Sequence, residues 1–438
     1  MRNRLTCIGA VSILIASAAL VACSSKYSPS SNGLIIVPSN ASIAMETLSL
    51  DLTNGATSQI NNVNGPPLDG EPGQVILNPS GTYAYVLIYQ NSAVTGGGTT
   101  GIDIFPVQSD GKLGTGSAAT LNQTLFMSPT NGCEMVSETP IQMATDSAGK
   151  YLFVANSGTA DPSGLPVPGS VSVLSIGTNG SLAEVNPVSC TNPSITGSPF
   201  PLPLQQAGRG NPTASALAVT STVYPQFYAF CSSGQTPPST EYLYVTDFNN
   251  NVLLNYSVSS SGGLTLNTTS TGNGVPTGVG PSGVAVDPCN RFAFVSNATS
   301  NNVSAYTICD QISTTAGCAL ADFSLHAVAN SPYAAGDLPG PIAVDAYGNF
   351  VYAVDTGSNQ VTSYRIGPGT GALTFEGNWA TNINPNSIAI RSDDSWIFVA
   401  NATSGNLSQY SINLTTGGLT AITTPVQTLN TPTGVAVK

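Results

Sequence analysis

The residues of this chain that could do acid–base chemistry are few, and most of them are carboxylic acids. The sequence has 22 Asp and Glu, ten Lys and Arg and one His among 438 residues. A positioned carboxylate can act as a general base, and an arginine can hold a carboxylate group through two parallel hydrogen bonds. The residues that we consider for a catalytic or binding site are Arg209, Glu134, Glu138 and Asp337.

Other acids have both a functional and a structural interpretation. They are Asp69, Glu71, Asp161, Asp247 and Asp355. They could supply an acid, a base or ligands for Ca²⁺. Asx side chains commonly accept hydrogen bonds from the backbone of their own turn, however, and no EF-hand-like loop is present, so turn capping is the favoured interpretation.

The single histidine, His326, follows the residues ADFSL in a predicted outer strand, which favours a surface or packing role. No Cys-x-x-Cys pair, paired His, Gly-x-Ser-x-Gly, Walker loop or His-Glu-x-x-His occurs. We therefore expect no metal and no cofactor. The formal net charge of −12 also argues against nucleic-acid binding, which needs a basic surface.

The first residues have the pattern of an export signal. Arg2 and Arg4 precede an apolar stretch that is short for a membrane span, and the stretch ends in Leu20-Val21-Ala22-Cys23. This ending resembles the bacterial lipobox, whose cysteine is acylated after the leader is cut. The alternative is an ordinary cleaved signal with a chance cysteine. Because Ser24 and not Asp follows, the resemblance implies anchoring of Cys23 in the outer membrane.

A phrase of strand, turn and strand recurs along the rest of the chain. Its clearest copies are TPIQMATDSAGKYLFVAN, GPSGVAVDPCNRFAFVSN, GPIAVDAYGNFVYAVD and NPNSIAIRSDDSWIFVAN. A second hairpin follows each copy, carrying a strand such as NVSAYTI and a Gly-x-Leu turn. About 45 residues in four alternating strands is the period of a β-propeller blade. The tyrosines that recur in this strand, Tyr306, Tyr364 and Tyr410, are predicted to pack between blades.

The two ends of the chain complete each other. Residues 34–58 align without gaps on residues 396–420, so they supply strands two to four of a blade that lacks strand one. The last phrase, TPTGVAVK, has strand one alone. We therefore predict an all-β, seven-bladed propeller of four-stranded antiparallel blades, which the C-terminal strand closes. The predicted segments are 1–22 as signal, 23–32 as lipidated tether and 33–438 as propeller.

The phrases YLFVAN, WIFVAN and FAFVSN and the recurrent Gly-x-Leu-Thr resemble the YVTN-repeat and lactonase-like (6-phosphogluconolactonase-like) seven-bladed propellers. The resemblance covers nearly all of the mature chain. It implies this fold, and for some relatives it implies opening of sugar lactones by His, Glu and Arg around a central pocket. With only one His, this chain departs from that set.

The loops sort onto two faces of such a ring. Loops before strand one and between strands two and three share one face, and this face receives most of the insertions; we call it the elaborated face. Arg209, Glu134, Glu138 and Asp337 all fall there. Propellers of this kind bind ligands there, so by analogy we expect a binding site on it.

Six cysteines follow Cys23, an even number that suggests disulfides in an exported protein. The face assignment predicts the pairs Cys133–Cys190, Cys231–Cys289 and Cys309–Cys318. The alternative is that they are buried free thiols.

Two functions remain open at this stage. The favoured one is a non-enzymatic, monomeric lipoprotein of the cell envelope that binds a protein, glycan or small ligand through its elaborated face. The alternative is a lactonase-like hydrolase of a sugar or related lactone outside the cytoplasm. An enzyme should gather Arg209 and two or more acids at the mouth of the channel, whereas a binding scaffold should show scattered charges.

Overall fold

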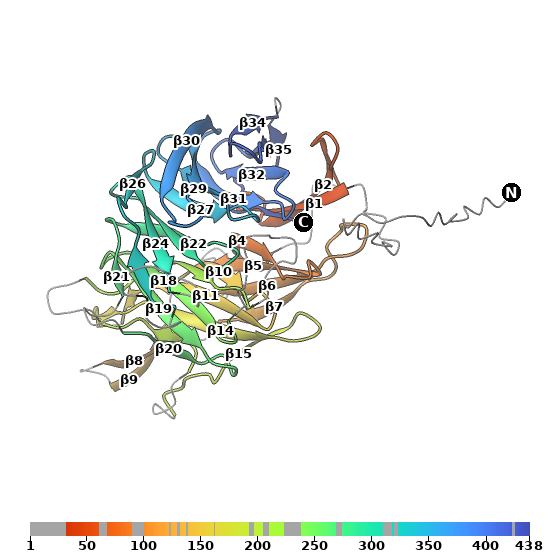
Figure 1. The fold of residues 1–438 in the computed structure, drawn as a ribbon. Coiled ribbons are helices and arrows are strands. Elements are labelled where there is room, and N and C mark those ends of the chain that lie inside the picture. The colour runs from red at the N-terminus through yellow and green to blue at the C-terminus, as the bar shows by residue number, and fades with distance from the viewer. Residues whose placement is uncertain are drawn as a thin grey trace, which may run out of the picture.

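The structure is a computed structural model. It describes residues 32–60, 68–89, 100–121, 124–128, 132–136, 139–161, 163–191, 197–204, 210–222, 238–268, 274–309, 318, 323–422 and 425–438. Its strands form seven antiparallel sheets arranged as the blades of a propeller, with two small hairpins outside the blades (Figure 1). The predicted seven-bladed β-propeller is confirmed.

Each blade has four strands in meander order, and most blades gain a short fifth strand beside strand three. From the innermost strand outward, the first three blades have the following strands. Blade 1 contains β36 (Ala436–Val437), β1 (Asn32–Ser39), β2 (Ala44–Asp51) and β3 (Thr57–Gln59). Blade 2 contains β4 (Glu71–Leu77), β5 (Tyr83–Tyr89), β6 (Gly101–Pro106) and β7 (Ser117–Thr120). Blade 3 contains β10 (Thr139–Thr145), β11 (Tyr151–Ser157), β14 (Ser170–Ile176), β15 (Leu182–Glu184) and the added β16 (Phe200–Pro201).

The remaining four blades follow the same order. Blade 4 contains β17 (Ala214–Val219), β18 (Glu241–Asp247), β19 (Val252–Val258), β20 (Leu264–Leu266) and the added β21 (Val275–Pro276). Blade 5 contains β22 (Pro281–Val286), β23 (Phe292–Asn297), β24 (Asn302–Ile308), β25 (Leu325–Ala327) and the added β26 (Tyr333–Ala334). Blade 6 contains β27 (Pro339–Val344), β28 (Phe350–Asp355), β29 (Gln360–Ile366) and β30 (Leu373–Ala380). Blade 7 contains β31 (Pro385–Ile390), β32 (Trp396–Asn401), β33 (Asn406–Ile412), β34 (Leu419–Ala421) and the added β35 (Val426–Gln427).

Both ends of the chain meet in blade 1, as the repeat alignment predicts. β36 pairs antiparallel with β1, with Ile35 opposite Val437 and Ile36 opposite Ala436. The main chains of Leu34 and Lys438 exchange two hydrogen bonds, of 3.1 and 2.8 Å. Figure 1 shows the red N-terminal strands beside the blue C-terminal blade, with the C-terminus at the join. Closure removes the free sheet edges that an open array of blades would expose.

The core is divided into seven apolar clusters, and each fills the space between two neighbouring blades. Strand two of each blade is almost wholly apolar because both of its faces are covered, as in WIFVAN of β32. The strand-three tyrosines pack between blades as predicted. The hydroxyls of Tyr306, Tyr364 and Tyr410 donate to main-chain oxygens of the preceding blade at 2.5–2.6 Å.

Side chains near the axis also bond across the junctions between blades. Ser215 donates to Pro281 O at 2.6 Å between blades 4 and 5, and Ser282 donates to Pro339 O at 2.6 Å between blades 5 and 6. Thr433 donates to Gly73 O at 2.9 Å and so joins the last strand of the chain to blade 2. Buried backbone acceptors are costly to leave unpaired, so these bonds fix the spacing of the blades around the axis.

Within the part of the chain that the structure describes, no helix is long and apolar enough to cross a membrane. The predicted signal, Cys23 and residues up to 31 lie outside the described residues.

Candidate functional site

The elaborated face carries the two hairpins that lie outside the blades. The first consists of β8 (Thr124–Ser128) and β9 (Gly132–Val136) and precedes blade 3. The second consists of β12 (Thr159–Ala160) and β13 (Pro166–Val167) and joins strands two and three of blade 3. In Figure 1 the β8–β9 hairpin stands apart from the ring of blades.

A disulfide links the first hairpin to blade 3. Cys133 of β9 is bonded to Cys190, which follows the outer strand of blade 3, and their Cα atoms are 5.6 Å apart. This is the predicted pair within the elaborated face. A cross-link of this kind restricts the unfolded chain and holds an element with little core of its own in place.

Cys289, Cys309 and Cys318 lie toward the opposite face. Cys309 and Cys318 form a disulfide, as predicted, with a Cα separation of 5.1 Å. Cys289 is also disulfide-bonded, and its predicted partner, Cys231, lies outside the described residues. His326 lies in β25, the outer strand where the sequence places it, and a ring nitrogen lies within 4.8 Å of both Cys309 and Cys318 sulfurs. Because the disulfide occupies both sulfurs, this group does not offer the thiolates that a zinc site needs.

The predicted cluster around Arg209 falls largely on segments that are not described. Arg209 and Glu138 lie outside the described residues, and Glu134 is placed in β9 by its backbone alone. The convergence of an arginine with two acids stays a prediction.

Asp337 is exposed and lies between blades 5 and 6. Its carboxylate accepts a hydrogen bond from Asn301 Nδ2 at 3.0 Å, and its main-chain N–H donates to Ser358 Oγ at 2.6 Å. Asp69 and Glu71 lie across the ring at the entry to blade 2. The structure therefore does not bring these three predicted acids together.

Three of the predicted acids are buried and hydrogen-bonded within the protein. Asp161 is buried, and its Oδ1 accepts from the main-chain N–H groups of Ser163 and Leu165 at 2.9 and 2.7 Å. Asp247 and Asp355 are buried where strand two ends, and burial raises the pKa of both carboxyls. Asp247 accepts from the main-chain N–H groups of Thr213 and Asn250, in keeping with turn capping, whereas Asp355 accepts from the side chains of Gln360 and Thr362 on β29.

Asp355 and Asn401, which lie at the end of strand two in blades 6 and 7, share one arrangement. Asp355 Oδ2 accepts from Thr362 Oγ1 at 2.5 Å, and Asn401 donates to Ser408 Oγ at 3.0 Å. In each case the partner is a hydroxyl residue on strand three of the same blade. This bond joins strands two and three at the edge of the elaborated face.

Blade 2 departs from this pattern and contains an acid that our sequence reasoning missed. Ile88 occupies the Asn position of strand two, and Asp103 occupies the hydroxyl position of strand three. Asp103 is 4% exposed, and its Oδ2 accepts from the main-chain N–H of Asp69 at 3.0 Å. Burial raises the pKa of Asp103 to about 6. An alignment of the strand-three segments alone would have revealed an acid in place of Ser or Thr.

The strands that line the central axis carry almost no ionisable side chains. Among the seven innermost strands, Glu71 at the start of β4 is the one ionisable residue. The innermost strands therefore offer Glu71 as their one candidate acid or base.

Other buried acids lie on the opposite face. Burial raises the pKa of Asp345 to about 7, and the nearby Asp394 adds to the effect. Asp345 Oδ1 accepts from the main-chain N–H groups of Asn349 and Phe350 at 2.7 Å each, so it caps the first hairpin of blade 6. Asp394 accepts from Ala346 and Tyr347 and joins blade 7 to that hairpin.

Comparisons with known proteins agree with this fold. Residues 229–438 match the model of the family described as lactonase, seven-bladed β-propeller. A putative 6-phosphogluconolactonase from Bacteroides fragilis is similar in structure, with a TM-score of 0.67 and 16% identity over 94% of this chain and 100% of that one. A periplasmic gluconolactonase from Pseudomonas aeruginosa gives a TM-score of 0.63 and 17% identity over 93% of this chain and 99% of that one. Among curated protein sequences, none matches the chain. The chain is thus a seven-bladed β-propeller, and its residues 229–438 are similar to the lactonase family.

Proposed function

We propose that this protein is an exported, lactonase-like hydrolase that opens an uncharged sugar lactone on its elaborated face. The match of residues 229–438 to the lactonase propeller family carries the proposal, and it favours hydrolysis over the non-enzymatic binding role that the sequence alone favours. The similar fold of a periplasmic gluconolactonase and the disulfides are in keeping with work outside the cytoplasm. We also propose that Cys23 is acylated and that residues 23–32 tether the protein to a membrane.

The charge of the chain points to the class of lactone. The formal net charge is −12, and the axial strands carry no cation. A phosphorylated lactone would approach a negative protein and would need a cluster of basic groups for its phosphate. An unphosphorylated sugar lactone has no such requirement.

Lactone opening needs a base for the attacking water. The base accepts a proton as the water oxygen bonds to the ester carbonyl carbon, the bond from that carbon to the ring oxygen breaks, and the ring oxygen takes up a proton to give a hydroxy acid. Asp103, with a pKa near 6, is an acid of this face suited to the role at neutral pH. Arg209 is our candidate for polarising the carbonyl.

The test is turnover of a panel of sugar lactones by the soluble form starting at Ser24, followed with a pH indicator. We expect Asp103→Asn to lower kcat/KM about 100-fold, the usual contribution of a general base. Asp345→Asn is the matched control, because Asp345 is also a buried acid of raised pKa but lies on the opposite face. Full activity of Asp103→Asn would remove Asp103 from the mechanism, and absence of turnover across the panel would contradict the hydrolase.

One observation favours a second function, the non-enzymatic envelope lipoprotein that binds a protein, glycan or small ligand. Asp161 and Asp247 are bonded within their own turns, and Asp355 is bonded to Thr362 of strand three, so none of the three is left to react. If the panel gives no turnover, capture of an envelope component by the immobilised soluble form, lost when the β8–β9 hairpin is replaced by a short turn, would support this alternative.

A further inference from the structure

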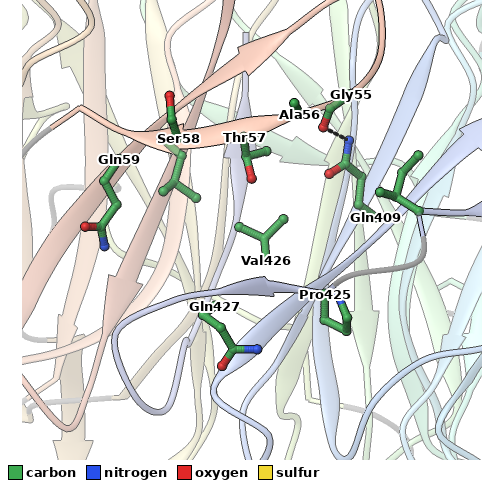
Figure 2. A pocket seen from close by; sticks show the side chains of 11 residues that line it. Gly55, Ala56, Thr57, Ser58, Gln59, Gln409, Pro425, Val426 and Gln427 are labelled. Carbon is green, nitrogen blue, oxygen red and sulfur yellow. Dashed lines mark hydrogen bonds between the residues drawn. The ribbon is translucent and has the colours of Figure 1, made fainter.

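A groove lies at the junction of blades 7 and 1, where the two ends of the chain are joined. It has a volume of about 450 Å³, within the range of small-molecule sites. One wall comes from the turn and outer strand of blade 1, and the other from β33, β35, Ile422 and Pro425 in blade 7 (Figure 2). It is on the periphery of the ring, and none of its lining residues belongs to the candidate site considered above.

The lining combines neutral polar groups with apolar ones. Three glutamines, Gln59, Gln409 and Gln427, share the groove with Thr57, Ser58 and the apolar side chain of Val426. None of its eleven lining residues carries a charge. Carboxamides and hydroxyls beside apolar surface match the alternating hydroxyl groups and C–H faces of an uncharged sugar.

Gln409 supplies an acceptor that the protein leaves unused. The residue is 2% exposed, and its Nε2 donates to Gly55 O at 2.8 Å. Its Oε1 has no hydrogen-bond partner within the protein, and Figure 2 shows this oxygen directed into the groove, toward Thr57. The amide cannot turn over, because its oxygen would then face the oxygen of Gly55. A buried acceptor without a partner is unfavourable, and a hydroxyl donor from a ligand would satisfy it.

A second glutamine is held in a matching way. Gln59 Nε2 donates to Oε1 of the buried Glu46 at 2.6 Å, and Oε2 of Glu46 accepts from the main-chain N–H of Leu429 at 2.9 Å. The amide oxygen of Gln59 is thereby left to accept. Gln409 therefore presents a fixed acceptor to a ligand that donates a hydroxyl hydrogen.

The junction of blades 4 and 5 repeats part of this arrangement. Asn255 occupies the strand-three position of Gln409, its Nδ2 donates to Phe323 O at 2.9 Å, and its Oδ1 has no partner within the protein. It lines a groove of about 370 Å³. Between blades 5 and 6 the equivalent residue is Ala305, and the groove of about 340 Å³ is lined by Tyr364 and Phe375. Some junctions between blades therefore have an amide side chain in their groove, and others do not.

We propose that the groove between blades 7 and 1 binds an uncharged mono- or disaccharide, with Gln409 Oε1 accepting a sugar hydroxyl. Trp396 offers a built-in reporter, because its ring packs against Gly55 at the rim of the groove; a Cβ on Gly55 would lie 2.5 Å from it. The chain has two tryptophans, so Trp379→Phe leaves Trp396 as the single fluorophore.

The experiment is a fluorescence titration of this single-tryptophan protein with D-glucose, maltose and D-glucuronate. We expect a saturable change with a neutral sugar, and a response to glucuronate at least about tenfold weaker because the groove offers its carboxylate no cation. Val426→Tyr fills the groove from a half-buried strand and should weaken the response about tenfold or more, as loss of one buried hydrogen bond would. Val275→Tyr is the matched control, because Val275 holds the same place in β21 of blade 4 and should leave the response of Trp396 unchanged.

Absence of any saturable change, an unaltered response in Val426→Tyr, or tighter binding of glucuronate would each overturn the proposal. Gln427→Ala, at an exposed position of the rim, provides a second weakening variant if Val426→Tyr does not fold. Lactone turnover is measured separately and depends on residues that do not line this groove, so failure here leaves the proposed hydrolase standing, and the reverse also holds.

Discussion

Gly371 of blade 6 lies against the aromatic ring of Phe292 in blade 5. Its φ is +68°, and a Cβ at this position would lie 2.5 Å from Phe292 Cδ1. The same relationship joins Gly417 to Phe350 one blade further on. The recurrent Gly-x-Leu turn and the recurrent aromatic residue of strand two are therefore two sides of one contact between blades.

This contact predicts that Gly371→Ala is destabilising. Both the left-handed backbone and the clash with Phe292 oppose a side chain, so we expect a loss of about 2 kcal/mol, seen as a lower urea midpoint. Gly369→Ala is the control within the same turn, because a Cβ there would meet no atom within 4 Å. Equal midpoints for the two variants would show that the contact does not stabilise the ring.

Removal of the Cys133–Cys190 disulfide should loosen one part of the elaborated face. We expect the Cys133→Ser/Cys190→Ser variant to exchange amide hydrogens faster in the β8–β9 hairpin, with the strands of blades 4 to 7 unchanged, because the hairpin lies outside the blades. Hydrogen-exchange mass spectrometry measures this directly. Faster exchange throughout the ring would mean that the disulfide supports the propeller itself.

The stability of the protein should fall as the pH rises toward 7. Burial raises the pKa of Asp345 from 3.8 to about 7, so the folded state holds this proton more tightly than the unfolded state. The stabilisation is complete below about pH 4 and is lost as the pH passes through the folded value. Asn resembles the protonated acid, so Asp345→Asn should raise Tm by about 1–2 °C at pH 8 and leave it unchanged at pH 4.

The control for that measurement is Asp337→Asn, because Asp337 is an acid that is exposed and not buried. A shift of Tm in Asp345→Asn that was the same at both pH values would contradict the titration of Asp345.

The acylation of Cys23 is tested in cells. We expect labelled palmitate to be incorporated into the full chain and the protein to fractionate with membranes, and Cys23→Ala to lose both properties. Cys7→Ala, within the same leader but outside the Leu-Val-Ala-Cys sequence, should retain them. If the Cys23→Ala variant incorporated no palmitate but still fractionated with membranes, the protein would be attached to the membrane without acylation of Cys23.

Repeat spacing explains how much of the fold could be predicted from the sequence. Each blade buries itself only against its neighbours, so residues such as Tyr306 and Tyr364 recur at equivalent positions, and the incomplete repeats at the two ends identify the closing blade. The pairing of Cys133 with Cys190 follows from the same alignment, because strand order decides which face a loop occupies.

The candidate site could not be predicted to the same depth. The raised pKa of Asp103 depends on its burial beneath the loop that carries Asp69, and the free acceptor of Gln409 depends on its bond to Gly55, more than 350 residues away. Neither is a property of a local pattern. Arg209 has no counterpart in the repeats that would fix its place.

The measurement that most directly tests the proposed function compares two substrates that differ by one charged group. Hydrolysis of D-glucono-1,5-lactone and of its 6-phosphate is followed for the soluble form starting at Ser24 under identical conditions. Because the protein carries a formal net charge of −12, we predict a higher kcat/KM for the uncharged lactone. Preference for the phosphorylated lactone, or turnover of neither, would contradict the account.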